Sequence, residues 1–113
     1  MPRAMIAYVE LPSNDVAAGK QFYGSLFGWS FVDYGPDYAS FSDSGLAGGL
    51  NGGSDHQTKA PLLVIDCDDL EAMLAKVVEA GGTITMPIFS FPGGRRFHFA
   101  DPAGNELAVM QVE

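Results

Sequence analysis

The segment PGGRRFHFADPAGNELAVMQ, residues 92–111, carries the pattern that decides the fold. Its two runs, residues 95–101 and 106–111, both predict strands: the first alternates polar and apolar side chains over residues 96–99, and the second is apolar over residues 107–110. Residues 101–105, DPAGN, lie between the runs and have the composition of a tight turn. A second turn signal, the Pro-Gly-Gly of residues 92–94, precedes the first run. The segment therefore predicts an antiparallel hairpin.

The residues before this hairpin predict a strand, a helix and a further strand. Residues 61–66, PLLVID, predict the first strand, and Asp68 or Asp69 is placed to cap a helix. The helix has an apolar stripe at helical spacing, formed by Leu70, Met73, Leu74 and Val77. It is expected to end at the Gly-Gly pair of residues 81–82, and residues 83–89, TITMPIF, predict the next strand.

The first half of the chain repeats this order. Residues 5–11, MIAYVEL, predict a strand, and the helix N-cap candidates after it are Ser13, Asn14 and Asp15. The predicted helix has an apolar stripe formed by Val16, Phe22, Tyr23 and Leu26. Gly28 is placed to end this helix. Three further strands are predicted, over residues 29–34, 38–43 and 46–50.

The two halves match when one is shifted onto the other. An offset of 53 residues places Asp15 on Asp68 and Gly28 on Gly81, and after a small insertion the offset becomes 59. No linker between the halves is long enough to separate them into domains. We therefore expect one α+β domain over residues 1–113, built from two βαβββ modules at about residues 1–55 and 58–113.

Charge and hydropathy exclude two classes of partner. The formal net charge is -8 with only six Lys and Arg residues, so phosphate backbones would be repelled and no nucleic-acid partner is expected. No apolar run approaches the roughly 20 residues that span a bilayer, and the N-terminus has no apolar signal-peptide core. We therefore expect a cytoplasmic protein with no membrane partner.

Three segments resemble signatures of the vicinal-oxygen-chelate superfamily, which includes glyoxalase I, bleomycin-resistance proteins and extradiol dioxygenases. They are FYGSLFGW at residues 22–29, EAGGTITMP at residues 79–87 and the hairpin segment 92–111. Together with the duplication, the resemblance covers nearly the whole chain. It implies that the modules form a curved, mostly antiparallel sheet cup with helices on the outer face.

The resemblance also implies four metal-ligand positions, one on the first and one on the last strand of each module. These positions fall on Tyr8, Gly49, Pro61 and Ala108. A divalent ion wants three or four nitrogen or carboxylate donors, which these residues do not supply, so no metal cofactor is expected. The chain has one cysteine, Cys67, and two histidines, His56 and His98. An alternative is a displaced metal site made by Glu10, His98 and Glu106, although a solvated carboxylate at the cavity rim is the favoured role of either glutamate.

Strand alternation divides the side chains between the two sheet faces. Leu62, Val64, Phe97 and Val109 are predicted to pack on the helices. The residues predicted to face the cavity and bind a ligand are Tyr8, Glu10, Leu63, Arg96, His98, Glu106, Ala108 and Met110. Because Gly49 and Ala108 are small, space for a ligand is expected to remain beside them. Tyr8 either binds a ligand oxygen or fills the void left by the ion, and His98 is either a general base or a structural histidine.

The leading hypothesis is a metal-free protein that binds a small apolar or aromatic molecule and has weak isomerase or lyase activity at most. One alternative is a metal-dependent glyoxalase or dioxygenase with displaced ligands. Another is a structural or stress-response dimer that binds no ligand. The resemblance further implies a homodimer, which is also the commonest oligomer of soluble proteins.

Overall fold

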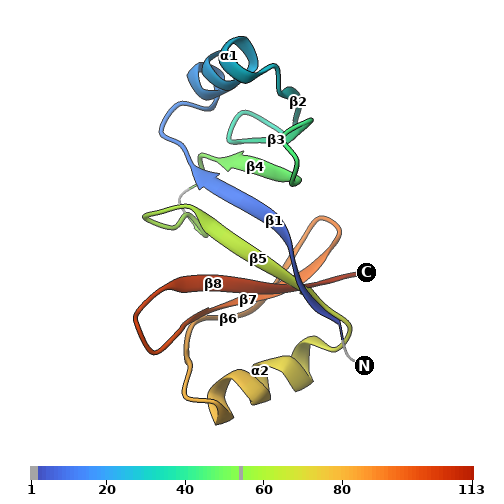
Figure 1. Cartoon of the computed structure of the whole chain (residues 1–113), viewed down its shortest axis with the longest axis vertical. Coiled ribbons are helices and arrows are strands. Elements are labelled where there is room, and N and C mark those ends of the chain that lie inside the picture. Colours follow the sequence, from blue (N-terminus) through green and yellow to red (C-terminus); the bar gives the residue numbers. More distant parts are fainter. Residues whose placement is uncertain (1–2, 54) are drawn as a thin grey trace. The chain divides into compact units, whose positions relative to one another are not determined.

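A computed structural model describes residues 3–53 and 55–113 of the chain. Ten helices and strands lie within these residues (Figure 1): β1 (Ala4–Pro12), α1 (Val16–Phe27), β2 (Ser30–Asp33), β3 (Tyr38–Ser42), β4 (Gly48–Asn51), β5 (Leu62–Cys67), α2 (Leu70–Glu79), β6 (Thr83–Phe91), β7 (Gly94–Ala100) and β8 (Glu106–Val112). Their order is the βαβββ pattern written twice, so the predicted α+β class and modules are confirmed.

The contacts divide the chain into two compact units, which we call the first unit, Tyr8–Leu62, and the second unit, which combines Leu63–Glu113 with the start of β1 up to Ala7. In the first unit the strand order is β2-β3-β4-β1, where β4 and β1 are parallel and the other neighbours antiparallel. In the second unit the order is β5-β8-β7-β6, where only β5 and β8 are parallel. The strand pairs of both units are therefore mostly antiparallel.

Both helices begin at an aspartate and are followed by a glycine with positive φ. The side chain of Asp15 accepts a hydrogen bond from Ala18 N over 3.0 Å, and Gly28 follows α1 with a φ of 76°. In α2 the corresponding cap is Asp69, and Gly81 has a φ of 100°. Glycine adopts this left-handed conformation without the steric cost that a β-carbon brings, so both helices end where the sequence predicts.

Each unit has its own core between its helix and one sheet face. In the first unit the buried residues are Val16, Ala39, Phe41 and Leu50, and Tyr23 and Trp29 pack against them. In the second unit they are Cys67, Leu70, Phe97 and Val109. The prediction for α1 was partly wrong, because Phe22 and Leu26 are 58% and 59% exposed. Phe22 instead lies edge-on against Tyr23, with ring centroids 5.1 Å apart.

Neither described helix is long and apolar enough to cross a membrane. The strand faces opposite α1 and α2 carry most of the polar side chains that the sequence singled out.

Candidate functional site

The first unit holds a buried cluster of two phenols, a carboxylate and an amide, which we call the phenol–carboxylate cluster: Tyr8, Glu10, Tyr38 and Asn51. Val9 and Leu11 pack on the α1 side of β1, so strand alternation places Tyr8 and Glu10 on the opposite face. The hydroxyl groups of Tyr8 and Tyr38 are hydrogen-bonded to each other. Tyr38 Oη donates to Glu10 Oε2 over 3.0 Å, and Asn51 Nδ2 donates to Glu10 Oε1 over 3.2 Å.

The hydroxyl groups of Tyr8 and Tyr38 lie next to Gly49. Gly49 lies on β4 between β3 and β1, opposite Ser40 on one side and Glu10 on the other. A β-carbon on Gly49 would lie 2.6 Å from Tyr8 Oη and closer still to Tyr38 Oη. The prediction that space remains beside Gly49 was therefore wrong, because the two hydroxyl groups occupy it.

Burial bears on the role of Glu10 and on the protonation of Tyr38. Glu10 is only 4% exposed, which contradicts its expected role as a solvated carboxylate at a rim. Burial, followed by the negative charge of Glu10, raises the pKa of Tyr38 well above its ordinary value. Tyr38 is therefore a neutral hydrogen-bond donor at physiological pH.

The second unit holds an imidazole next to a carboxylate, which we call the imidazole–carboxylate pair: His98 and Glu106. His98 Nδ1 is 3.2 Å from Glu106 Oε2, and Thr85 Oγ1 donates to the same carboxylate oxygen over 3.0 Å. His98 is fully buried, whereas the Glu106 side chain is 33% exposed. Both residues were predicted to face the same side of the sheet, and the structure brings the carboxylate of Glu106 next to the ring of His98. A carboxylate next to Nδ1 fixes the orientation of the ring.

Aromatic rings and an arginine surround this pair. The Phe89 ring lies 5.7 Å from the His98 ring, and the Arg96 guanidinium lies 5.3 Å from the Phe89 ring and 5.9 Å from the Phe91 ring. Distances below about 6 Å are typical of cation–π contacts. This face of β7 is therefore polar at its centre and aromatic at its side.

The cross-strand register brings two more predicted residues to the same face. Ala108 lies opposite His98 on one side and Val64 on the other, and Met110 lies opposite Arg96. Phe97 and Val109 point the other way, into the α2 core, as the alternation predicts.

The predicted faces of β5 were wrong by one residue. Ile65 and Cys67 pack with α2, so Leu63, two residues before Ile65, lies on that same face and leaves the candidate site. Leu62 and Val64 lie on the opposite face and are fully buried. A shift of one residue along a strand moves every side chain to the other face.

Four residues of these clusters were missed from sequence: Tyr38, Asn51, Thr85 and Phe89. Tyr38 reaches Tyr8 only because β3 and β1 flank the glycine of β4. Periodicity within one strand carries no signal of such a pairing. The run of residues 38–43 predicted a strand with Tyr38 at its start, but not the partner of its hydroxyl group.

The residues at the positions implied for a metal do not suit one. In the first unit, phenol oxygens fill the place of a side chain at Gly49, and in the second, Ala108 has no donor atom. Within residues 3–53 and 55–113 no three His, Cys, Asp or Glu side chains come together so as to hold an ion. The chain's own donor set therefore does not match the metal chemistry that the resemblance implies.

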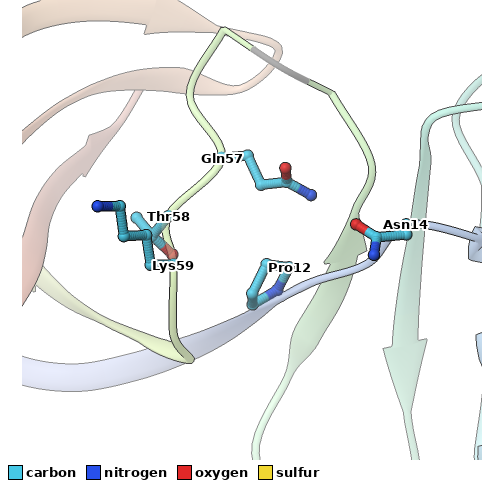
Figure 2. Close-up of a pocket in the computed structure, with 5 residues that line it drawn as sticks. All are labelled: Pro12, Asn14, Gln57, Thr58 and Lys59. Atoms are coloured by element: carbon cyan, nitrogen blue, oxygen red, sulfur yellow. The ribbon is translucent and has the colours of Figure 1, made fainter.

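A depression of about 460 Å³ opens at the surface of the first unit (Figure 2). It is lined by Pro12, Asn14, Gln57, Thr58 and Lys59. Gln57 Nε2 donates to the backbone carbonyl of Asn51 over 2.8 Å, so this amide holds the segment after β4 in place. The lining is polar and includes no member of the phenol–carboxylate cluster.

A family model described as Glyoxalase/Bleomycin resistance protein/Dioxygenase superfamily matches residues 5–109. A Mycobacterium bovis protein named as a glyoxylase, CFP32, is 31% identical over 116 residues, which cover 93% of this chain and 44% of that protein. The anthracycline biosynthesis protein DnrV of Streptomyces peucetius is 32% identical over 128 residues, with coverages of 93% and 46%. The chain thus spans less than half the length of these relatives.

A solved structure shares the fold. The Mn(II)-bound glyoxalase from Novosphingobium aromaticivorans superposes with a TM-score of 0.70 at 23% identity, over 98% of this chain and 40% of that chain. At this level of identity the likeness concerns the fold alone.

Proposed function

The chain belongs to the glyoxalase/bleomycin resistance protein/dioxygenase superfamily, and from that premise we propose that it binds a small apolar or aromatic molecule without a resident metal ion. The observation that carries the proposal is the phenol–carboxylate cluster. Its two hydroxyl groups take the place of a side chain at Gly49, and one of them belongs to a half-buried tyrosine, Tyr8. A few placed polar groups among apolar side chains are the usual composition of a small-molecule site.

Two further features support this proposal. The imidazole–carboxylate pair lies beside Phe89, so the second unit also offers polar groups next to an aromatic ring. One relative is named for the biosynthesis of anthracyclines, which are small molecules. Each cluster is a candidate binding site on its own unit.

A fragment screen by ligand-observed NMR tests the binding proposal. Hits should lose at least about tenfold in affinity, about 1.4 kcal/mol, with Tyr8→Ala. The matched control is Val78→Ala on α2, which is 53% exposed and should leave the affinities unchanged. An absence of hits against folded protein would refute the proposal and favour a structural subunit that binds no ligand.

Weak isomerase or lyase activity is a second candidate function, and the imidazole–carboxylate pair favours it. An imidazole oriented by a carboxylate can remove a proton from carbon next to a carbonyl group. Bound carbonyl fragments in D₂O should then exchange that hydrogen faster with the wild type than with His98→Gln. Equal exchange rates for the two proteins would remove the activity from the proposal.

We also propose that the chain forms a homodimer, as closed twofold assemblies are the commonest among soluble oligomers. The chain mass is 12.0 kDa, so light scattering at micromolar concentration should give about 24 kDa. A mass of one chain would refute the dimer without affecting the binding proposal.

A further inference from the structure

The carboxylate of Glu106 has one oxygen that the protein holds and one that it leaves open. His98 Nδ1 lies 3.2 Å from Oε2, and Thr85 Oγ1 donates to the same oxygen over 3.0 Å. Among the residues that the structure describes, no group donates a hydrogen bond to Oε1. Oε1 is also not one of the buried polar atoms that lack a partner there, so it is accessible to solvent. A bound molecule can therefore reach Oε1.

An irregularity in β6 directs the hydroxyl group of Thr85 to this carboxylate. In the register of β6 and β7, Ile84 lies opposite Phe99 and Met86 lies opposite His98. Two steps along β6 therefore match one step along β7, and Thr85 is the extra residue. Ile84 packs with the α2 core, whereas the Thr85 side chain reaches the carboxylate on the opposite face. Bulges of this kind turn a side chain to a new direction and are common next to active sites.

The charge of Glu106 has no permanent cation beside it. No Lys or Arg in the described part of the chain forms an ion pair with Glu106, and His98 carries a charge only when its ring is protonated. Arg96 lies opposite Met110, four residues along β8 from Glu106, which is about 13 Å at the usual rise of a strand. This end of the sheet is therefore suited to a positively charged ligand.

The residues next to Glu106 on the sheet are small or exposed. Ala100 lies opposite Glu106 on one side and opposite Thr83 on the other. Ala100 is half-buried and Thr83 is exposed. The side chain of alanine is a single methyl group, so the strand partner of Glu106 does not cover the carboxylate.

We propose that Glu106 Oε1 binds the ammonium group of an organic amine, so that the second unit takes a ligand which is cationic as well as apolar or aromatic. Thr85 and His98 act as positioning residues, because their hydrogens hold Oε2 and leave Oε1 to accept from the ligand. A hydrogen bond between an ammonium group and a carboxylate is about twice as strong as one between neutral groups. This inference rests on the proposed function and specifies the ligand class of the second unit.

Benzylammonium and benzyl alcohol test the inference, because they have nearly the same shape and differ in charge. Both are titrated by ligand-observed NMR at neutral pH and about 0.15 M salt, which screens the attraction of the net charge of -8 for any cation. The wild type should bind benzylammonium at least about fivefold more tightly than benzyl alcohol. Glu106→Gln, which has no charge, should bind the two probes with affinities within about twofold of each other.

Two sets of variants separate the site from its surroundings. Glu79→Gln is the matched control, because it removes the same charge from an exposed residue of α2, and it should leave the preference unchanged. Thr85→Val removes the hydroxyl group at nearly equal shape and should lower the preference at least about twofold. Thr85→Ser keeps a hydroxyl group and should keep the preference. Circular dichroism confirms that each variant is folded.

Equal affinities of the wild type for the two probes would overturn the inference and leave the binding proposal intact. A preference that Glu79→Gln lowers as much as Glu106→Gln would do the same, since it would come from net charge alone. If Thr85→Val keeps the preference, or Thr85→Ser loses it, the positioning role of Thr85 is wrong.

A measurement on the wild type covers the case in which Glu106→Gln does not fold. Benzylammonium should then shift the backbone amide signals of residues 98–100 and 106–108 more than those of other residues. If the largest shifts lie elsewhere, the site is refuted. If neither probe nor any screened fragment binds the wild type, the proposed function fails and this inference fails with it.

Discussion

Replacing Gly49 by alanine tests whether the two phenols occupy the space of a side chain on β4. The new β-carbon would lie 2.6 Å from Tyr8 Oη and closer still to Tyr38 Oη. Carbon contacts are ordinarily about 3.5–4.0 Å, so the phenols must retreat by about 1 Å. The Tyr38–Glu10 hydrogen bond, 3.0 Å long in the wild type, would then exceed bonding distance.

The expected loss of stability follows from these two effects. Overpacking of a buried site costs about 1–3 kcal/mol, and loss of a hydrogen bond to a charged group costs about 1.5–3 kcal/mol. The two costs overlap, because the movement that relieves the clash is also the movement that breaks the bond. We therefore expect Gly49→Ala to lower the free energy of unfolding by about 2–4 kcal/mol.

Urea denaturation followed by circular dichroism measures this difference. Gly53→Ala is the matched control, since its β-carbon would lie 3.4 Å from Asn51 Oδ1 and the backbone N–H is kept. It should change the free energy by no more than about 0.5 kcal/mol. If Gly49→Ala is as stable as Gly53→Ala, the phenols do not fill the glycine slot and the reasoning about the cluster is refuted.

Three further measurements probe the same clusters. Burial and the charge of Glu10 raise the pKa of Tyr38 above 10.0, so the unfolded state should lose this proton before the folded state does. Above pH 10 the free energy of unfolding should therefore fall by about 1.4 kcal/mol per pH unit more in the wild type than in Tyr38→Phe. Parallel pH profiles of the two proteins would contradict this. Nitrogen-15 NMR should show the neutral His98 ring protonated at Nδ1 in the wild type and a tautomer mixture in Glu106→Ala; an unchanged ring would count against an orienting role of Glu106. Zinc, nickel or manganese should give no saturable rise in melting temperature, since specific binding at a hundredfold excess over the dissociation constant would stabilise the protein by about 2.7 kcal/mol.

The element order was predictable because turns and helix ends depend on local chemistry. Gly28, Gly81 and Gly104 have φ values of 76°, 100° and 91°, a conformation that residues with a β-carbon rarely adopt. Asp101 accepts hydrogen bonds from Ala103 N and Asn105 N, each 2.9 Å long, and so forms the turn before β8 by contacts within a few residues. These signals do not need the rest of the fold.

The face of β5 was not predictable from the repeat because the two helices differ in length. The caps are Asp15 and Asp69, yet the glycines after the helices are Gly28 and Gly81, so α2 is one residue shorter between cap and glycine. Matching the glycines placed Asp15 on Asp68 and shifted the strand before it by one residue. A shift of one residue changes the predicted face of a helix only partly, whereas in a strand it moves every side chain to the opposite face of the sheet.

The hydrogen-bonded clusters were beyond sequence reasoning for a different reason. Tyr8 and Tyr38 are 30 residues apart, and His98 and Glu106 sit on neighbouring strands. Their meeting depends on cross-strand register and on side-chain direction, which one sequence does not encode locally. Composition could identify the polar residues on the sheet, but not which of them share a hydrogen.

Filling the space beside Gly49 would not require the polar side chains of the phenol–carboxylate cluster. A phenylalanine at Tyr8 and a leucine at Glu10 would occupy similar volume without burying a carboxylate. Burying Glu10 at 4% exposure has a desolvation cost that the donors Tyr38 and Asn51 only offset. Apolar side chains of similar size would fill the same space without this cost. The hydrogen-bonded cluster is therefore not explained by packing alone.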